Sequence, residues 1–219
     1  MQKSIMRSPV IAAILLVVAS VLLLFGVINA VQAAPRVQSN DYRAEVGLSS
    51  ISTEITENGS PVEGDGALLK KLVPEGQKFE VGKTYDESLA VHNNGSADEY
   101  VRVTVSLFWE NADGKAVNLD PSLIKLHFVE GGGWSIDKDA STPERTVLYY
   151  SEPVAAGAST TPFADTITID KQVLSPVTKS ASGDVYDYNG VKFRVKAVAD
   201  AVQTHNGTAA MTSAWGRTI

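Results

Sequence analysis

The sequence predicts an all-β protein: an antiparallel β-sandwich of the jelly-roll or immunoglobulin-like kind, with short helical turns and an apolar helix before it. Short segments in which apolar and polar residues alternate recur along the chain. Turns rich in Gly, Pro and Asn separate these segments, and no strand–helix–strand rhythm is present. The chain has no cysteine, so the burial of apolar surface must hold the sandwich together without disulfides.

The strongest of these segments is residues 100–109, which we expect to be the central strand. Its polar residues alternate with apolar ones, and all but one of the apolar residues are β-branched or aromatic: Val101, Val103, Val105, Leu107 and Trp109. Turn sequences at 93–96 and 111–114 bracket the segment. This pattern is typical of an antiparallel strand that buries one face.

Weaker signals place the other elements on both sides of this strand. A first strand is expected at residues 42–48, with 51–55 as its continuation, and a glycine-rich loop follows at 58–66. Further strands are expected at 85–92, 126–128, 134–136, 146–150, 163–169 and 191–201. The Asn189-Gly190 step predicts a hairpin between 185–188 and the last of these strands. Helical turns are expected at 120–123 and 170–174, and a short helix at 206–215 with Met211 and Trp215 facing inward.

Residues 1–33 are expected to be a secretory signal peptide. Lys3 and Arg7 precede a long stretch without any charged residue, and Val31 and Ala33 have the small size that signal peptidase accepts at these positions. Cleavage by signal peptidase is then expected between Ala33 and Ala34.

Two outcomes of export remain open for this leader. Once it is cleaved, residues 34–219 form a single β-sandwich domain that is secreted. If residues 8–33 are instead retained, they form a membrane anchor, because about 20 apolar residues also span a bilayer. In both cases the positive charge before the apolar stretch places the domain outside the cytoplasm, either secreted or at the cell surface.

The charge of the domain argues against nucleic acid as a partner. All 25 acidic residues and 17 of the 19 basic ones fall within 34–219, for a net charge near −8. Nucleic acids and anionic lipids both require a basic face. Neither is therefore expected to bind the domain itself.

The sequence predicts no catalytic residue, no cofactor and no metal ligand. The three histidines, His92, His127 and His205, have no spacing that presets a metal site, and a three-histidine site would have to be assembled in space. Calcium is a weaker alternative at four loop acids, although the surrounding residues lack the Gly and the distal Glu of an EF-hand loop: Asp113, Asp120, Asp137 and Asp139. We therefore do not expect an enzyme.

A set of short motifs gives the chain a resemblance to a known family. The motifs are Ala201-Val202-Gln203-Thr204-His205-Asn206, Ser213-Ala214-Trp215-Gly216, Pro74-Glu75-Gly76, His92-Asn93-Asn94-Gly95 and Tyr100-Val101-Arg102-Val103. Over residues 42–216 the chain resembles the TasA/camelysin family of Gram-positive exported proteins, although it lacks the aromatic-rich start after Ala33 that is usual there. The resemblance implies a jelly-roll-like sandwich, release by a dedicated signal peptidase and assembly into extracellular fibres of the biofilm matrix. It also implies a metallopeptidase alternative, since some members are described as such.

In fibres of that family, the first strand of one subunit is thought to complete a sheet of the next, so other copies of the chain are the expected partners. The four apolar residues of the first strand are spaced to fill alternate pockets of such a sheet: Tyr42, Ala44, Val46 and Leu48. The alternative is that this strand pairs within its own domain. A monomeric, membrane-anchored binding module and a camelysin-like metallopeptidase remain as further hypotheses.

Overall fold

Ten strands, two 3-10 helices and one α-helix make up the part of the chain that the structure describes. The structure is a computed structural model that describes residues 50–62, 68–69, 72–175 and 186–219. The predicted N-terminal helix, the cleavage position between Ala33 and Ala34 and the first strand at 42–48 lie outside these residues. Among the described residues, none of the helices combines the length and the hydropathy needed to cross a membrane.

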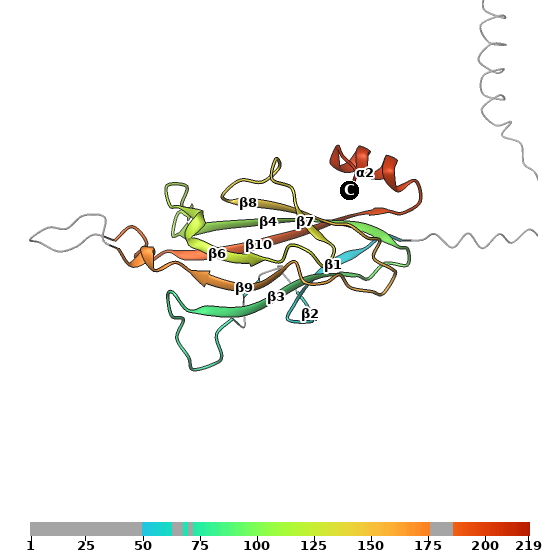
Figure 1. The fold of residues 1–219 in the computed structure, drawn as a ribbon. Coiled ribbons are helices and arrows are strands. Elements are labelled where there is room, and N and C mark those ends of the chain that lie inside the picture. The colour runs from blue at the N-terminus through green and yellow to red at the C-terminus, as the bar shows by residue number, and fades with distance from the viewer. Residues whose placement is uncertain (1–49, 63–67, 70–71, 176–185) are drawn as a thin grey trace, which may run out of the picture. The chain divides into compact units, whose positions relative to one another are not determined.

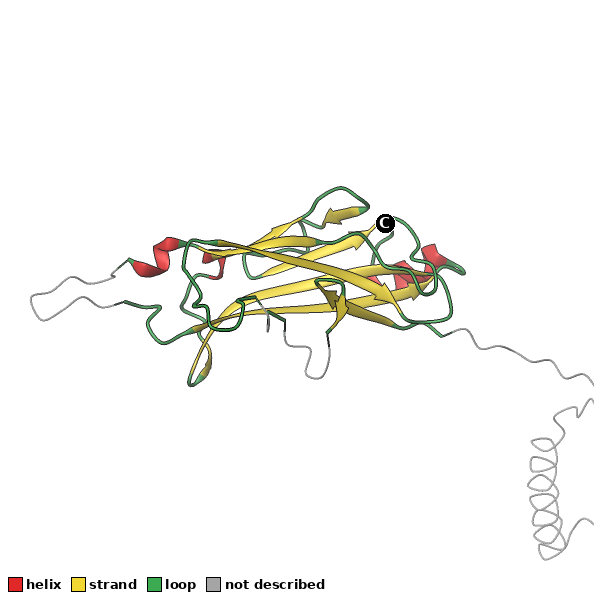
Figure 2. Cartoon of the chain, turned by 90° about the horizontal axis from the view of Figure 1, so that it is seen from below, coloured by secondary structure: helices red, strands yellow, loops and turns green. Residues whose placement is uncertain are grey.

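The strands form two antiparallel sheets, which lie as two layers (Figures 1 and 2). One sheet has the order β2-β1-β3-β9-β6 and the other β10-β4-β8-β7, with β5 pairing the end of β4. The strands are β1 (Thr53–Glu57), β2 (Ser60–Pro61), β3 (Thr84–Asn93), β4 (Glu99–Asn111), β5 (Gly114–Lys115), β6 (Ile124–Phe128), β7 (Trp134–Ile136), β8 (Arg145–Tyr150), β9 (Ala164–Ile169) and β10 (Lys192–Gln203). The helices are η2 (Pro121–Leu123), η3 (Lys171–Leu174) and α2 (Gly207–Trp215).

The order of pairing confirms the predicted β-sandwich and favours its jelly-roll form. After β3 the chain passes repeatedly between the sheets: β4 and β5 lie in one, β6 in the other, β7 and β8 in the first again, β9 in the second and β10 in the first. The pair β4–β8 is thus nested within the pair β3–β9. Such connections between two antiparallel sheets are those of a jelly roll.

The core lies between the sheets, and β4 supplies its central row, as the sequence predicts. Val101, Val103 and Val105 are completely buried. They face Leu89 and Phe163 of the other sheet, which belong to the same apolar cluster and are also completely buried. Burial of each such side chain contributes about 1.5–3 kcal/mol. The free energy of folding therefore comes mainly from β4 and the strands that face it.

Helix α2 lies on the outer face of the second sheet, close to the C-terminus (Figure 1). Met211 is buried there, as predicted. Trp215 instead packs outside the sandwich, with its ring 5.5 Å from that of Tyr149 and 5.6 Å from the guanidinium of Arg102. Glycine at position 207 allows the start of α2 to pack closely on the sheet, because a Cβ there would lie 2.7 Å from the ring of Tyr100.

Two of the predicted elements are wrong. The first described strand is β1, so residues 51 and 52 do not belong to a strand, and the loop predicted at 58–66 contains β2. Asn58 and Gly59 both have positive φ, of 50° and 79°, which is the geometry of a tight hairpin turn between β1 and β2.

The hairpin predicted before β10 is also absent from the described residues, since 186–190 form a turn and no strand. The reason is that Tyr188 packs elsewhere. Its ring lies 4.9 Å from that of Trp109, and its hydroxyl accepts a hydrogen bond from the N–H of Asp120 at 3.1 Å. These contacts hold the segment against the β4–η2 connection, and β10 is left without the predicted neighbour.

Candidate functional site

Among the residues that the structure describes, β10 is an edge strand of unusual length. Its 12 residues pair with β4 over the whole ladder, from Lys192 opposite Glu110 to Gln203 opposite Glu99. On its other side, no strand of the described residues pairs with it, although β1 of the other sheet lies close to it. A long free edge is a template for pairing with another chain, and native proteins usually shorten or cover it.

Two hydrogen bonds beside the ladder show which backbone groups face the open edge. The N–H of Leu107 in β4 donates to Glu144 on the β8 side at 2.8 Å, and the N–H of Thr204 donates to Asp98 on the β4 side at 3.4 Å. Backbone groups alternate between the two sides of an antiparallel strand, so Thr204 and every second residue before it face β4. The N–H and C=O groups of the residues between these therefore face the open edge: Phe193, Val195, Ala197 and Ala199.

The side chains of these same four residues point to the inside of the sandwich. They lie opposite Trp109, Leu107, Val105 and Val103, which form the buried row of β4. A strand added at this edge would thus extend the sheet and also send every second side chain between the two sheets. The inward side chains on β10 become small along the strand, from Phe193 to Ala197 and Ala199.

An apolar groove of about 450 Å³ opens at the start of this edge. Its lining comes from the segment before β3, the ends of β4 and β9, η3 and the start of β10 with the turn before it, and its aromatic part consists of Phe79, Trp109, Tyr188 and Phe193. The rings hold one another in place, since Phe79 lies 5.3 Å from Phe193 and 5.0 Å from Tyr85. The groove is therefore a preformed site for an apolar or aromatic side chain.

Basic residues border the groove and the edge on their outer side. Lys192, Arg194 and Lys196 alternate with the inward residues of β10, and Arg194 pairs with Glu110 across the ladder at 2.5 Å. Such charges on an edge strand oppose unspecific pairing. They favour an incoming segment that carries a carboxylate on its outer face.

Two acids in the inward rows of the central strands were not expected from the sequence. Glu99 begins β4 and is completely buried, and neither of its carboxylate oxygens has a hydrogen-bond partner. Burial raises the pKa of Glu99 to about 7, and the hydroxyl of Thr53 and the backbone of Ser52 lower it only in part. At acid pH this side chain is stable as the uncharged acid, and it begins to ionise as the pH approaches 7.

Glu87 occupies the same kind of position in β3, at a bulge where the pairing with β9 shifts. It is 1% exposed, its Oε1 has no partner, and its Oε2 accepts a long hydrogen bond of 3.5 Å from Asn58. Burial, together with a hydrogen bond to the carboxyl of Glu57 and repulsion from it, raises the pKa of Glu87 to about 8. Glu87 is thus uncharged at neutral pH.

The three histidines do not form a site. His92 in β3 is hydrogen-bonded to Ser159 at 3.0 Å, His127 in β6 to Asp165 at 2.7 Å, and His205 lies exposed in the turn before α2. The bond from His127 is the main reason why the pKa of Asp165 lies below its usual value. In the part of the chain that the structure describes, no three His, Cys, Asp or Glu residues come together to hold a metal ion.

Of the four loop acids considered for calcium, Asp120 and Asp137 have local partners for their carboxylates. Asp113 lies in the β4–β5 turn, and Asp120 caps η2 by accepting from the N–H of Ser122 at 2.9 Å. Asp137 accepts from the N–H groups of Asp139 and Ala140, each at 3.1 Å, and pairs with Arg217 at 2.5 Å. Burial of Asp137 opposes ionisation, but these bonds outweigh it and hold its pKa below the usual value.

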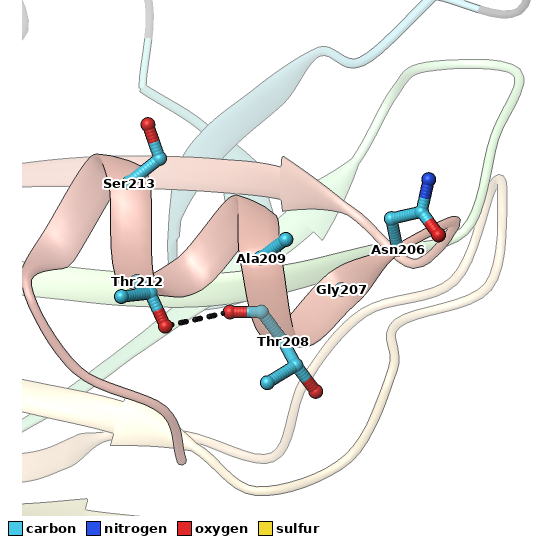
Figure 3. Close-up of a pocket in the computed structure, with 6 residues that line it drawn as sticks. All are labelled: Asn206, Gly207, Thr208, Ala209, Thr212 and Ser213. Atoms are coloured by element: carbon cyan, nitrogen blue, oxygen red, sulfur yellow. Dashed lines mark hydrogen bonds between the residues drawn. The ribbon is translucent and has the colours of Figure 1, made fainter.

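A second, shallow hollow lies along α2 and is lined by its hydroxyl-bearing face (Figure 3). The figure shows Thr212 donating to the backbone oxygen of Thr208, a bond of 2.8 Å. The lining residues carry no charge: Asn206, Gly207, Thr208, Ala209, Thr212 and Ser213. Its polar groups are hydroxyls and one amide, which can donate and accept hydrogen bonds but carry no charge.

Comparison of the chain with family models, with curated proteins and with solved structures gave no match. The site residues expected from the sequence at Tyr42, Ala44, Val46 and Leu48 lie outside the described residues. The β10 edge and the groove beside it are therefore the features on which a function can be argued.

Proposed function

We propose that the protein is an extracellular or cell-surface structural subunit that assembles with copies of itself by β-strand addition, as a fibre-forming or biofilm-matrix protein does. The observation that carries this proposal is the edge of β10, with which no strand of the described part of the chain pairs. Seven consecutive residues of that edge, 193–199, present alternating backbone groups to the outside and small or apolar side chains to the inside. This combination is what strand addition requires of an acceptor.

Residues 42–48 of another copy match this acceptor in length and pattern. Both segments have seven residues and span about 20 Å when extended. Antiparallel pairing of Tyr42 with Ala199 brings Leu48 to Phe193 at the aromatic groove, and places Glu45 opposite Lys196 on the outer face. The parallel alternative would set Arg43 against Arg194, which like-charge repulsion disfavours. The antiparallel register is therefore the one we propose.

Electron microscopy of negatively stained protein tests the assembly. Processed protein that starts at Ala34 is expected to form filaments at high concentration and single particles at low concentration. A version that lacks residues 34–49 is expected to give only single particles. If the processed protein stays monomeric at every concentration, the proposal is wrong.

A proline in β10 tests the acceptor edge itself. Ala197→Pro removes an N–H that faces the open edge and leaves the ladder with β4 intact, so we expect the loss of filaments with a nearly unchanged melting temperature. The matched control is Ala112→Pro in the turn after β4, where proline suits the turn and filaments should persist. Filaments from Ala197→Pro would show that assembly uses another surface.

The aromatic groove supports a second candidate function, that of a monomeric binding module held at the membrane by residues 8–33. A preformed apolar groove bordered by Lys192 is suited to a ligand with an apolar body and an acidic group. Intact mass of the exported protein separates the candidates, since a mass equal to that of all 219 residues supports the anchor.

A further inference from the structure

Strand β1 has an inner face that is unlike those of the other long strands. Ile55 lies opposite Val91, which is completely buried, so the inward residues of β1 are Thr53, Ile55 and Glu57. Only one of the three is apolar. On its other side β1 pairs with β2, which has two residues, and it also lies close to β10. The inner face of β1 therefore contributes little apolar burial of its own.

The polar residues at the two ends of this inner row, Thr53 and Glu57, each lie next to a buried acid. Thr53 lies next to Glu99, and its hydroxyl, like the carboxylate of Glu99, is buried without a hydrogen-bond partner. Glu57 lies next to Glu87 and shares a hydrogen bond with it. A carboxyl group in such surroundings is tolerated when it is protonated, but its ionised form has to be hydrated or paired.

The surroundings of the two acids offer no compensating positive charge among the described residues. Glu57 from β1 is the charged group that acts on Glu87, and Asn58 is its other polar neighbour. Around Glu99, β1 contributes Thr53 and Ser52, β10 contributes the uncharged Gln203 on the opposite strand, and the segment before β9 contributes the backbone of Val154. Ionisation of either acid therefore leaves a buried charge that the polar neighbours Asn58, Thr53 and Ser52 stabilise only in part.

We propose that β1 is a proton-controlled latch, which stays on the edge of β3 while Glu87 and Glu99 are protonated and detaches from it when they ionise. Detachment lets water reach both carboxylates, whereas the rest of the sandwich would have to unfold to do so. With pKa values of about 8 and about 7 when β1 is attached and the ordinary value of 4.5 once it has detached, attachment weakens as the pH rises from 4.5 to about 8. Release would expose the β3 edge at Leu89–Asn93 and lengthen the segment that precedes the domain.

The latch belongs to a single subunit and does not depend on the proposed assembly. Hydrogen exchange measured by mass spectrometry on dilute processed protein tests it, from pH 6 to pH 9 and with intrinsic exchange rates corrected. Peptides from β1 are expected to lose protection as the pH rises, by up to about tenfold per pH unit for each ionising acid. Peptides from β4 are expected to keep theirs. Protection of β1 that does not change with pH would overturn the proposal.

Variants identify the groups responsible. Glu99→Gln is expected to weaken the pH dependence of β1 exchange, and the double variant Glu87→Gln/Glu99→Gln to abolish it, because glutamine resembles the protonated acid. The matched control is Glu54→Gln on the outer row of β1, which should behave like the unmodified protein. If the double variant does not fold, the pH dependence of β1 exchange in Glu99→Gln alone tests the proposal. An unchanged response in Glu99→Gln, or its suppression by calcium in the unmodified protein, would refute control by protons.

Discussion

Strands β4 and β1 represent two ways of building a strand into the same sandwich. The inner row of β4 is apolar from Val101 to Trp109, and it lies between β10 and β8 in the middle of its sheet. The inner row of β1 has a single apolar residue, Ile55, and its polar ends contact buried acids. Each strand is antiparallel and regular, so the difference lies in the side chains.

This difference teaches where the sandwich is stable and where it is open to change. The buried aliphatic side chains of β4 make it part of the cooperative core. We expect β1 and the outer edge of β10 to unfold locally more easily. Parts that exchange partners are drawn from such regions, because their opening costs less than global unfolding. The proposed assembly and the proposed latch both use these regions.

Aliphatic truncation in the two regions should give the largest contrast. Leu148 in β8 is completely buried opposite Val103, and Leu148→Ala is expected to lower the free energy of unfolding by about 2–5 kcal/mol. The matched change Ile55→Ala in β1, where Ile55 is only partly buried, is expected to lower the free energy of unfolding by clearly less. Urea unfolding followed by tryptophan fluorescence measures both. Equal losses would mean that β1 belongs to the cooperative core.

The pH dependence of stability should give the next largest effect. The folded pKa values of Glu87 and Glu99 lie above the ordinary value of 4.5, so the unfolded chain releases these protons first. Their contribution is therefore most favourable below pH 4.5 and is lost as the pH rises to about 7 and 8, at about 1.4 kcal/mol per pH unit for each acid.

Urea unfolding at pH 5, 6.5 and 8 measures this loss. Glu99→Gln is expected to be more stable than the unmodified protein at pH 8, by about 1–3 kcal/mol, since no buried charge forms. Glu54→Gln, on the outer row of the same strand, should make no difference at any of these pH values. A stability that rises between pH 5 and pH 8 would contradict the assignment of these two acids.

Much of the sandwich could be predicted because its central strands follow a simple period. The strand expected at 100–109 is β4, the one at 85–92 is β3, and Asp120 caps η2 as its sequence suggests. The hairpin before β10 could not be predicted in the same way. Asn189-Gly190 is a good turn sequence, but the position of the Tyr188 side chain depends on its contact with Trp109, which is distant in the chain. Local turn chemistry does not report such contacts.

The candidate site was harder to predict than the fold. An open edge is a property of the whole sheet, and it appears only when the neighbour of β10 is known to be absent from the described residues. The buried acids did leave a signal in the sequence. Glu87 falls in the same alternating row as Leu89 and Val91, and Glu99 falls in the row of Val101, so the period that predicts the core also places two acids in it.

The smallest effect we predict concerns Thr53, at the point where the two kinds of strand come closest. Its buried hydroxyl has no partner, so the isosteric change Thr53→Val should stabilise the protein by about 1 kcal/mol at pH 5.5, where Glu99 is protonated. The same change at Thr104, on the outer face of β4, controls for the higher strand propensity of valine. Thermal unfolding compares the two variants. A loss of stability in Thr53→Val alone would mean that this hydroxyl donates a hydrogen bond to Glu99 that the folded protein needs, and that β1 is held at this end by that bond as well as by the proton.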